Sequence, residues 1–288
     1  MSGGSTGLPS RPGPQREAAP SGAAGTCAGV DAARTRASAW AALVLLVGGL
    51  SIGVVLALMG GPWQLLAALH LGALAIWFLV WRRSWRDLLR SAGPRSPWLL
   101  FAVGAGLCAL SAVARHPIDN PGVVLAPVTP TGLLSALAMA LGVGVLMNAV
   151  PEELSLRRCL LEPLRAQFGD RFALWTTALA FVVMHLPTWI SSHATASTYA
   201  AEVPEKLFFG LVAAWSVLRL DSLAFALGMH VGGNFTGVVL DSLSREETLS
   251  GWSRFTTPFV IALLTETLVT AAAIWYLGRP SRTSRPRH

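Results

Sequence analysis

Most of the chain consists of long apolar runs separated by short polar segments. Six runs contain no Asp, Glu, Lys or Arg, namely residues 40–59, 63–81, 98–114, 131–150, 172–190 and 222–240, and two more contain few charges, residues 203–218 and 255–277. A helix needs about 20 apolar residues to cross ~30 Å of hydrocarbon, and a backbone in lipid must satisfy its hydrogen bonds internally. The pattern therefore predicts an all-α, polytopic transmembrane helical bundle of about eight spans.

The segments outside these runs predict the domain organisation and the topology. Residues 1–38 are rich in Gly, Pro and Ser and predict a disordered cytoplasmic tail, residues 39–278 the transmembrane domain, and residues 279–288 a basic cytoplasmic tail. With the N-terminus in the cytoplasm, 18 of the 22 Lys and Arg residues fall on the cytoplasmic side. This is the bias of the positive-inside rule, so we predict that both termini are cytoplasmic.

The composition supports a membrane protein. Only 13% of the residues are charged and 53% are hydrophobic, whereas soluble domains carry about 25% charged residues. The formal net charge of +7 is mostly topological, and no basic stripe is interleaved with aromatic residues, so we expect no nucleic-acid partner. Arg outnumbers Lys by 21 to 1, which favours GC-rich codon usage and predicts a bacterial plasma-membrane location.

Three polar motifs interrupt these apolar surroundings. They are Pro-Glu-Glu-Leu-Ser-Leu-Arg at residues 151–157, Phe-Val-Val-Met-His at 181–185 and His-Val-Gly-Gly-Asn at 230–234. Polar groups inside membrane spans are costly and are by default functional candidates. The alternatives are surface charges on a cytoplasmic loop for the first motif and hydrogen-bonded bundle residues for His185 and His230.

The first motif has its own internal geometry. Glu153 and Arg157 are four residues apart, hence on one helical face and able to pair. Glu152 points elsewhere, which leaves its carboxylate able to titrate as a general base. In the third motif, His230 and Asn234 share a face, and the two glycines between them admit a close approach by a backbone or a substrate.

The depth of the motifs constrains the fourth span. If this span ended at Val150, Glu152 would lie at the surface, whereas His185 lies ~20 Å and His230 ~12 Å into the membrane at about 1.5 Å per residue. The groups meet only if the fourth helix is shifted to about 141–161, with residues 131–139 partly extracellular or interfacial. Pro151 should bend this helix and free a backbone carbonyl. Glu266, in the last run, is expected to pair with a polar neighbour.

The three motifs in this order, Glu-Glu-x-x-x-Arg, Phe-x-x-x-His and His-x-x-x-Asn, resemble the CPBP family of intramembrane proteases over about residues 131–240. That family includes the eukaryotic CAAX prenyl endopeptidase and the bacterial Abi-type bacteriocin-immunity proteins. The resemblance implies that Glu152 and His185 activate a water and that His230 and Asn234 hold the oxyanion. Glu153 and Arg157 would brace the site, and Phe181 belongs to its motif. Leu156 and Arg158 depart from the family's usual Phe and Gly, which concerns the substrate groove.

These residues suit peptide hydrolysis, which needs an activated water and donors for a tetrahedral oxyanion. We therefore predict an intramembrane endopeptidase acting on peptide or membrane-protein substrates among membrane lipids, without a cofactor. A zinc site made of Glu152, His185 and His230 is the alternative. Other readings are a transporter, a bacteriocin-immunity or scaffold factor that uses the same cluster for binding, and a family member that folds but no longer cuts.

Overall fold

The computed structural model describes residues 95–119, 123–125, 127–246 and 257–279, together with the separate positions 40, 41, 44 and 55. The predicted spans at 40–59 and 63–81 lie almost entirely outside these residues, as do the two predicted tails. The number of spans and the side of the membrane on which the termini lie therefore stay predictions.

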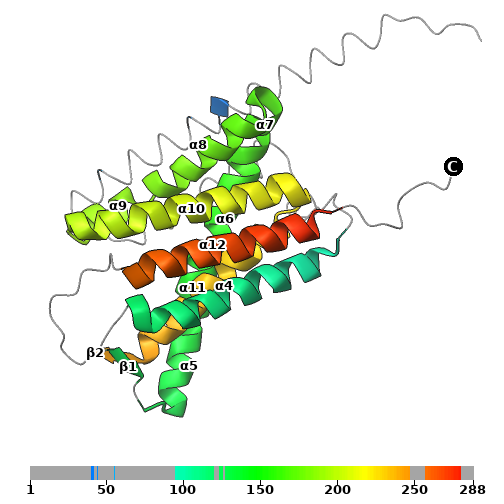
Figure 1. Ribbon diagram of the computed structural model, residues 1–288. Coiled ribbons are helices and arrows are strands. Elements are labelled where there is room, and N and C mark those ends of the chain that lie inside the picture. The colour runs from blue at the N-terminus through cyan, green and yellow to red at the C-terminus, as the bar shows by residue number, and fades with distance from the viewer. Residues whose placement is uncertain are drawn as a thin grey trace, which may run out of the picture.

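The described residues are helical almost throughout (Figure 1), which confirms the predicted all-α class. The helices are α4 (Pro97–Asp119), α5 (Pro130–Met139), η1 (Ala140–Ala149), α6 (Val150–Glu153), η2 (Leu154–Leu161), α7 (Glu162–Phe168), α8 (Asp170–Val183), α9 (Leu186–Ser191), α10 (Ala196–Leu220), α11 (Ala224–Leu243) and α12 (Thr257–Leu277). One small exception is an antiparallel pair of short strands, β1 (Val123–Leu125) and β2 (Ser244–Glu246), which joins the segment after α4 to the end of α11.

The shifted fourth helix is confirmed in part. The elements α5 to α7 form one continuous helix from Pro130 to Phe168, 39 residues long, with the first motif well inside it. Residues 131–139 belong to this helix, which begins where the Thr129 hydroxyl accepts from Gly132 N (3.1 Å) with Pro130 at the first turn. At about 1.5 Å per residue the helix is ~58 Å long, nearly twice the ~30 Å hydrocarbon thickness.

The helix accommodates Pro151 by widening its turns. The segments on either side of α6, η1 and η2, are π-helical, and Val150 N donates to Val145 O, five residues earlier. Single π-helical turns are more usual and are frequent at functional sites. The wider hydrogen-bonding pattern accommodates Pro151, which has no amide hydrogen to donate. The local change near this residue is therefore a change from α-helix to π-helix.

Four of the described helices are long and apolar enough to cross a membrane: Pro97–Ile118, Pro130–Phe168, Asp170–Ser191 and Val260–Leu277. Their outer faces carry large apolar side chains that the bundle leaves exposed, among them Trp98, Leu110, Leu134, Leu268 and Tyr276. Apolar surface this extensive is unlike that of a soluble monomer. The protein is therefore an integral membrane protein.

Five basic residues of the described part lie toward the two ends of the bundle, while Arg157 and Arg158 are buried inside it. At one end, Arg95 Nε donates to Leu277 O (3.2 Å), Arg219 lies 5.1 Å from the Trp275 ring and Arg165 pairs with Asp221 (3.8 Å). Arg115 and Lys206, assigned to the opposite side by the sequence, both contact Glu205 near the other ends of α4 and α10. This separation agrees with the predicted topology, whose orientation in the membrane stays a prediction.

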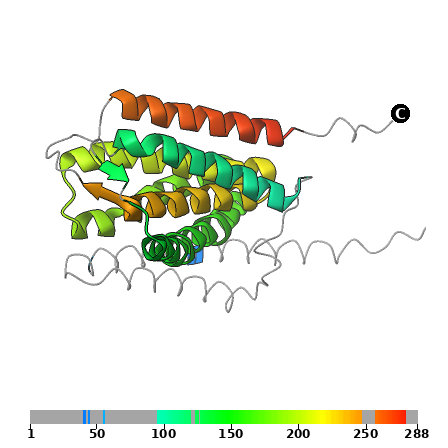
Figure 2. The ribbon, with the colours of Figure 1, turned by 90° about the horizontal axis from the view of Figure 1, so that it is seen from below.

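Helices α4 and α11 pack almost backbone to backbone. A Cβ at Gly228 would lie 2.2 Å from Phe101 O, and one at Gly232 would lie 2.2 Å from Ala105 O. The close approach expected of Gly232 is thus made by the backbone of α4. In Figure 2, α12 covers α4 from the outside, and the long helix is seen end-on across the bundle from α12. This glycine seam brings α4 and α12 next to the third motif.

Candidate functional site

A buried carboxylate lies at the centre of the site. Arg157 Nε donates to Glu153 Oε2 (3.2 Å), and both side chains have no exposed surface, which confirms the predicted pair. His230 Nδ1 lies 3.1 Å from the other oxygen of Glu153, Oε1. The carboxylate of Glu153 is therefore held between a cation from its own helix and an imidazole from α11. We call Glu152, Glu153, Arg157 and His230 the motif cluster.

Glu152 faces the same imidazole from the other side. Its Oε2 atom lies 3.7 Å from His230 Nε2. This oxygen is buried and has no hydrogen-bond partner in the described residues. Because Glu153 accepts the hydrogen on Nδ1, the Nε2 atom of His230 faces Glu152. The sequence predicted the roles of these residues but not this sandwich of one imidazole between two carboxylates.

Phe181 lies near the end of α8, and His185 follows that helix. The Phe181 ring is 4.9 Å from the His185 ring and 5.7 Å from the His230 ring, so it separates the two imidazoles. His185 Nδ1 is 2.7 Å from Phe181 O. A carbonyl oxygen only accepts, so Nδ1 carries the hydrogen, and the neutral imidazole has its lone pair on Nε2. The break between α8 and α9 falls at His185.

Asn234 joins α11 to the long helix. Its Nδ2 atom donates to Gly144 O (3.3 Å), on η1. A Cβ at Gly144 would meet Asn234 O at 3.2 Å, so the glycine permits this close approach. The side chain predicted to hold an oxyanion thus also fixes the register between the two helices.

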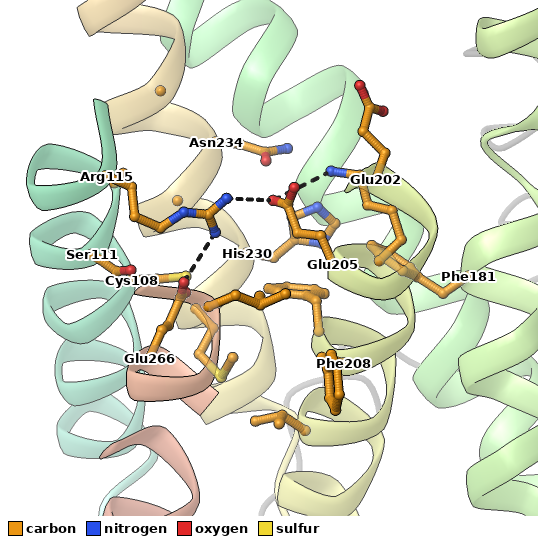
Figure 3. A pocket seen from close by; sticks show the side chains of 18 of the residues that line it. Cys108, Ser111, Arg115, Phe181, Glu202, Glu205, Phe208, His230, Asn234 and Glu266 are labelled. Atoms are coloured by element: carbon orange, nitrogen blue, oxygen red, sulfur yellow. Dashed lines mark hydrogen bonds and ion pairs between the residues drawn. The ribbon is translucent and has the colours of Figure 1, made fainter. Parts of the chain in front are cut away.

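The residues of the second and third motifs share a cavity of about 500 Å³. His185, His230, Asn234 and Phe181 line one part of it. Another wall carries charged residues from three helices, namely Arg115 of α4, Glu202, Glu205 and Lys206 of α10, and Glu266 of α12. Figure 3 labels Arg115, Glu202, Glu205 and Glu266 among them. The apolar side chains of Phe208, Phe209, Val212, Met229 and Leu263 also border it. The cavity therefore offers both charged and apolar surface to a ligand.

Arg115 ties the charged wall together. It lies between two carboxylates (Figure 3), with Nη1 3.2 Å from Glu266 Oε2 and Nη2 3.5 Å from Glu205 Oε1. Lys206 Nζ is 3.9 Å from the same Glu205 oxygen, and Cys108 Sγ donates to Glu266 Oε1 (3.6 Å). The expectation that Glu266 pairs with a polar neighbour is confirmed. We call Arg115, Glu205 and Glu266 the outer cluster.

Sequence reasoning missed two features of the cavity. The sequence does not single out Arg115 and Glu205, since nothing local shows that α4, α10 and α12 bring them together. Asn148, which also lines the cavity, was not singled out. Its signal was available, because it is a polar residue in an otherwise apolar run, four residues before Glu152.

The zinc alternative does not fit this arrangement. Among the described His, Cys, Asp and Glu residues, no three converge as ligands of one metal ion. Glu152, His185 and His230 therefore do not form a zinc site here.

The two departures from the family pattern lie away from the cavity. Leu156 packs in the hydrophobic core between η2, α8 and α10. Arg158 is mostly buried and pairs with Glu162 on the same helix. The cavity wall is therefore not altered directly by either residue.

Comparison with known proteins agrees with this geometry. The family model described as type II CAAX prenyl endopeptidase Rce1-like matches residues 133–236, a segment that contains all three motifs. No curated protein and no solved structure matches the chain. The match suggests a CAAX-type intramembrane protease and does not favour a transporter or a scaffold. The chain thus carries, at residues 133–236, an Rce1-like domain of the CPBP, or CAAX protease, family.

Proposed function

We propose that the protein is an intramembrane endopeptidase that hydrolyses peptide bonds of membrane-associated substrates with a water activated by Glu152 and His185. One observation carries the proposal. A buried carboxylate oxygen without a hydrogen-bond partner, Glu152 Oε2, faces an imidazole that Glu153 and Arg157 hold from behind. This arrangement lies within the segment that matches the Rce1-like family.

The first step is attack by water. Glu152 takes one proton as the water oxygen bonds to the scissile carbonyl carbon, and the electron pair of the C=O bond moves onto the carbonyl oxygen. His185 assists by accepting a hydrogen bond from the water at Nε2, the nitrogen left without hydrogen by the Phe181 contact. The resulting oxyanion is held by His230 and Asn234, which line the same cavity.

The second step expels the amine. The oxyanion electrons re-form the C=O bond, the C–N bond breaks, and the leaving nitrogen takes the proton from Glu152. Glu153 and Arg157 do not touch the substrate in this scheme. Glu153 accepts the hydrogen on His230 Nδ1 and stabilises the imidazolium form, whose Nε2–H donates to the oxyanion, and Arg157 holds Glu153 in place, so both are positioning residues.

The substrates we propose are membrane-associated peptides or membrane proteins. The apolar outer faces of the helices place the cavity in a bilayer protein. The family name refers to prenylated CAAX proteins. For the bacterial plasma membrane predicted from Arg usage, we propose processing of peptides or membrane proteins in their place.

The test compares membranes from cells that express wild type, Glu152→Gln or Glu162→Gln by terminal-peptide mass spectrometry. Glu162 lies on the same continuous helix, is 43% exposed and pairs with Arg158, so it is a matched control. New peptide termini are expected with wild type and Glu162→Gln and not with Glu152→Gln. The same termini in the Glu152→Gln sample would refute the proposed function.

Purified protein gives the rate. Cleavage of an internally quenched, farnesylated CAAX-type peptide and of its unprenylated counterpart should fall by about 10²–10⁴-fold in Glu152→Gln, the usual contribution of a general base. Full activity in the presence of a metal chelator is expected, and loss of activity would contradict the metal-free scheme.

A further inference from the structure

Asn148 is a polar side chain of the cavity that the proposed chemistry has not used. It lies on η1 and lines the cavity together with His185, His230 and Asn234. Its side-chain oxygen, Oδ1, is buried and has no hydrogen-bond partner in the described residues. Buried polar atoms in native proteins are nearly always paired, with protein or with ordered water. An unpaired acceptor in a reaction cavity therefore indicates a bound water or substrate donor.

The position of Asn148 along the helix places it at the reaction centre. Gly144, Asn148 and Glu152 follow one another at four-residue spacing, hence on approximately one face. The first of these is bonded to Asn234 of α11 through its carbonyl, and the last faces His230 of α11. Asn148 thus lies about one turn from each of the contacts that join the long helix to the third motif.

Two acceptor atoms on this face share the same unsatisfied state. Glu152 Oε2 and Asn148 Oδ1 are both buried and both lack a hydrogen-bond partner in the described residues. Side chains four residues apart on a helix have Cβ atoms about 5–6 Å apart. One water making two hydrogen bonds of about 2.8 Å can bridge two side-chain oxygens up to about 5.6 Å apart, which is within the reach of side chains at this spacing. One hydrogen of such a water points to Glu152 Oε2, and Asn148 Oδ1 shares the other with His185 Nε2 in a three-centre hydrogen bond.

We propose that Asn148 is a water-positioning residue, which holds the second hydrogen of the water that Glu152 deprotonates. With one hydrogen on Asn148 Oδ1 and the other on Glu152 Oε2, the lone pairs of the water oxygen point away from the long helix. On attack, the proton facing Glu152 moves to that carboxylate, and the hydrogen facing Asn148 stays on the new hydroxyl group. This inference rests on the proposed peptidase function.

The kinetic test replaces Asn148 with a side chain of similar size that cannot accept a hydrogen bond. With whichever of the two internally quenched peptides, farnesylated or unprenylated, the wild type cleaves faster, Asn148→Leu is expected to lower kcat by about 10²-fold, as for loss of one preorganised polar group, and to leave KM within about twofold. Asn148→Asp keeps an oxygen acceptor and should recover at least about tenfold of that loss. Met147→Leu, the neighbouring position on η1, is the control and should behave as wild type.

Several outcomes separate this inference from the proposed function. If Glu152→Gln abolishes cleavage while Asn148→Leu keeps the wild-type kcat, the function stands and the role of Asn148 is refuted. Unchanged cleavage in Glu152→Gln refutes both. If Asn148→Leu fails to fold, as judged by gel filtration in detergent, Asn148→Ser replaces it, and a kcat loss below about threefold in that variant counts against the inference.

A second arm needs no activity. An experimental structure of the wild-type protein that resolves waters should place one within about 3.2 Å of both Asn148 Oδ1 and Glu152 Oε2. The same site should lack that water in Asn148→Leu. A protein group bonded to Asn148 Oδ1 in place of water would overturn the inference, whatever the kinetics.

Discussion

The motif cluster and the outer cluster meet at the cavity, which His230 of the first cluster and all three residues of the second line, but the two clusters are built on opposite plans. In the motif cluster, Glu153 and Arg157 come from one helix, four residues apart, and have no exposed surface. In the outer cluster, Arg115 and Glu266 are 151 residues apart, come from different helices, and keep 11% and 21% of their side chains exposed. The first lies inside the segment that matches the Rce1-like family, and Arg115 and Glu266 lie outside it.

The comparison indicates that buried polar residues of this protein have two different roles, one in the reaction and one in holding helices together. The motif cluster holds three buried polar atoms without a hydrogen-bond partner in the described residues, namely Glu152 Oε2 and both Nη atoms of Arg157, whereas the outer cluster holds one, Arg115 Nε. In the outer cluster, each carboxylate is shared between partners, as Glu266 is between Arg115 and Cys108. Unpaired buried groups raise the energy of the folded state and are kept where chemistry uses them. We therefore expect the motif cluster to carry the reaction and the outer cluster to hold three helices together.

The largest effect is expected from breaking the ion pair inside the motif cluster. Arg157→Leu leaves the Glu153 carboxylate buried without its cation, which should lower the free energy of unfolding by about 3–5 kcal/mol. Thermal unfolding in detergent measures this loss. Arg158→Leu, whose partner Glu162 is 43% exposed, is the control and should lose much less. Equal decreases in unfolding temperature for Arg157→Leu and Arg158→Leu would contradict the expectation that the buried pair contributes more stability than the exposed one. The Glu153→Leu/Arg157→Leu double variant should recover part of the stability that Arg157→Leu loses.

A smaller effect is expected from widening the glycine seam, the close contact that Gly228 and Gly232 of α11 make with α4. A Cβ at Gly232 would lie 2.2 Å from Ala105 O, so Gly232→Ala must push α4 away from α11. We expect a loss of about 1–3 kcal/mol in the free energy of unfolding from overpacking, with slower cleavage because the charged wall moves relative to His230. Gly237→Ala meets nothing within 4 Å and is the matched control. Stability changes of equal size in the two variants would show that the seam is not tight.

The outer cluster should respond more weakly. Glu266→Gln keeps the shape of the side chain and leaves Arg115 paired with Glu205. Because these side chains are partly exposed, we expect a loss of about 1 kcal/mol in the free energy of unfolding. The peptide-cleavage assay should show a kcat decrease of less than about tenfold. A decrease as large as that of Glu152→Gln would place the outer cluster in the chemistry and remove the distinction between the two clusters.

The smallest effect is expected at the exposed ion pairs of Arg165, at the end of the bundle where Arg95 and Arg219 also lie. Arg165 contacts Asp170 (2.9 Å) and Asp221 (3.8 Å), with 41% of its side chain exposed. Arg165→Ala should change the free energy of unfolding by no more than about 0.5 kcal/mol and leave cleavage unchanged. The result for Arg165→Ala is the baseline against which Arg157→Leu, Gly232→Ala and Glu266→Gln are compared. A loss above about 1 kcal/mol in its free energy of unfolding would mean that side-chain exposure does not predict the order of these effects.

The local part of the site was predictable because helical spacing determines it. The Glu153–Arg157 pair follows from four-residue spacing, and the shift of the fourth helix follows from comparing depths along spans. The helix proved longer than the predicted 141–161, since residues 131–139 continue it and the apolar run gives no stop signal. The bend expected at Pro151 stays a prediction, and the π-helical turns on either side of α6 are a feature that propensity does not predict.

The long-range part was not predictable from spacing. The placement of His230 between Glu152 and Glu153 depends on how α11 crosses the long helix, which the Gly144–Asn234 contact helps to set. The ion pairs of Arg115 depend on α12 lying against α4, two helices far apart in the sequence. Packing angles and registers between helices arise from side-chain interlocking over whole faces, and no single residue encodes them.

By itself, the sequence determined that the protein is a helical membrane protein, that three polar motifs stand in apolar runs, and that they resemble those of the CPBP family. These are consequences of composition and of the helical repeat, which act within one segment. Only the tertiary structure decided that an imidazole lies between two carboxylates, that a charged wall faces it, and that Asn148 opens onto the same cavity. Those contacts join helices distant in the chain, and they exist because glycines let α4, α11 and the long helix approach closely.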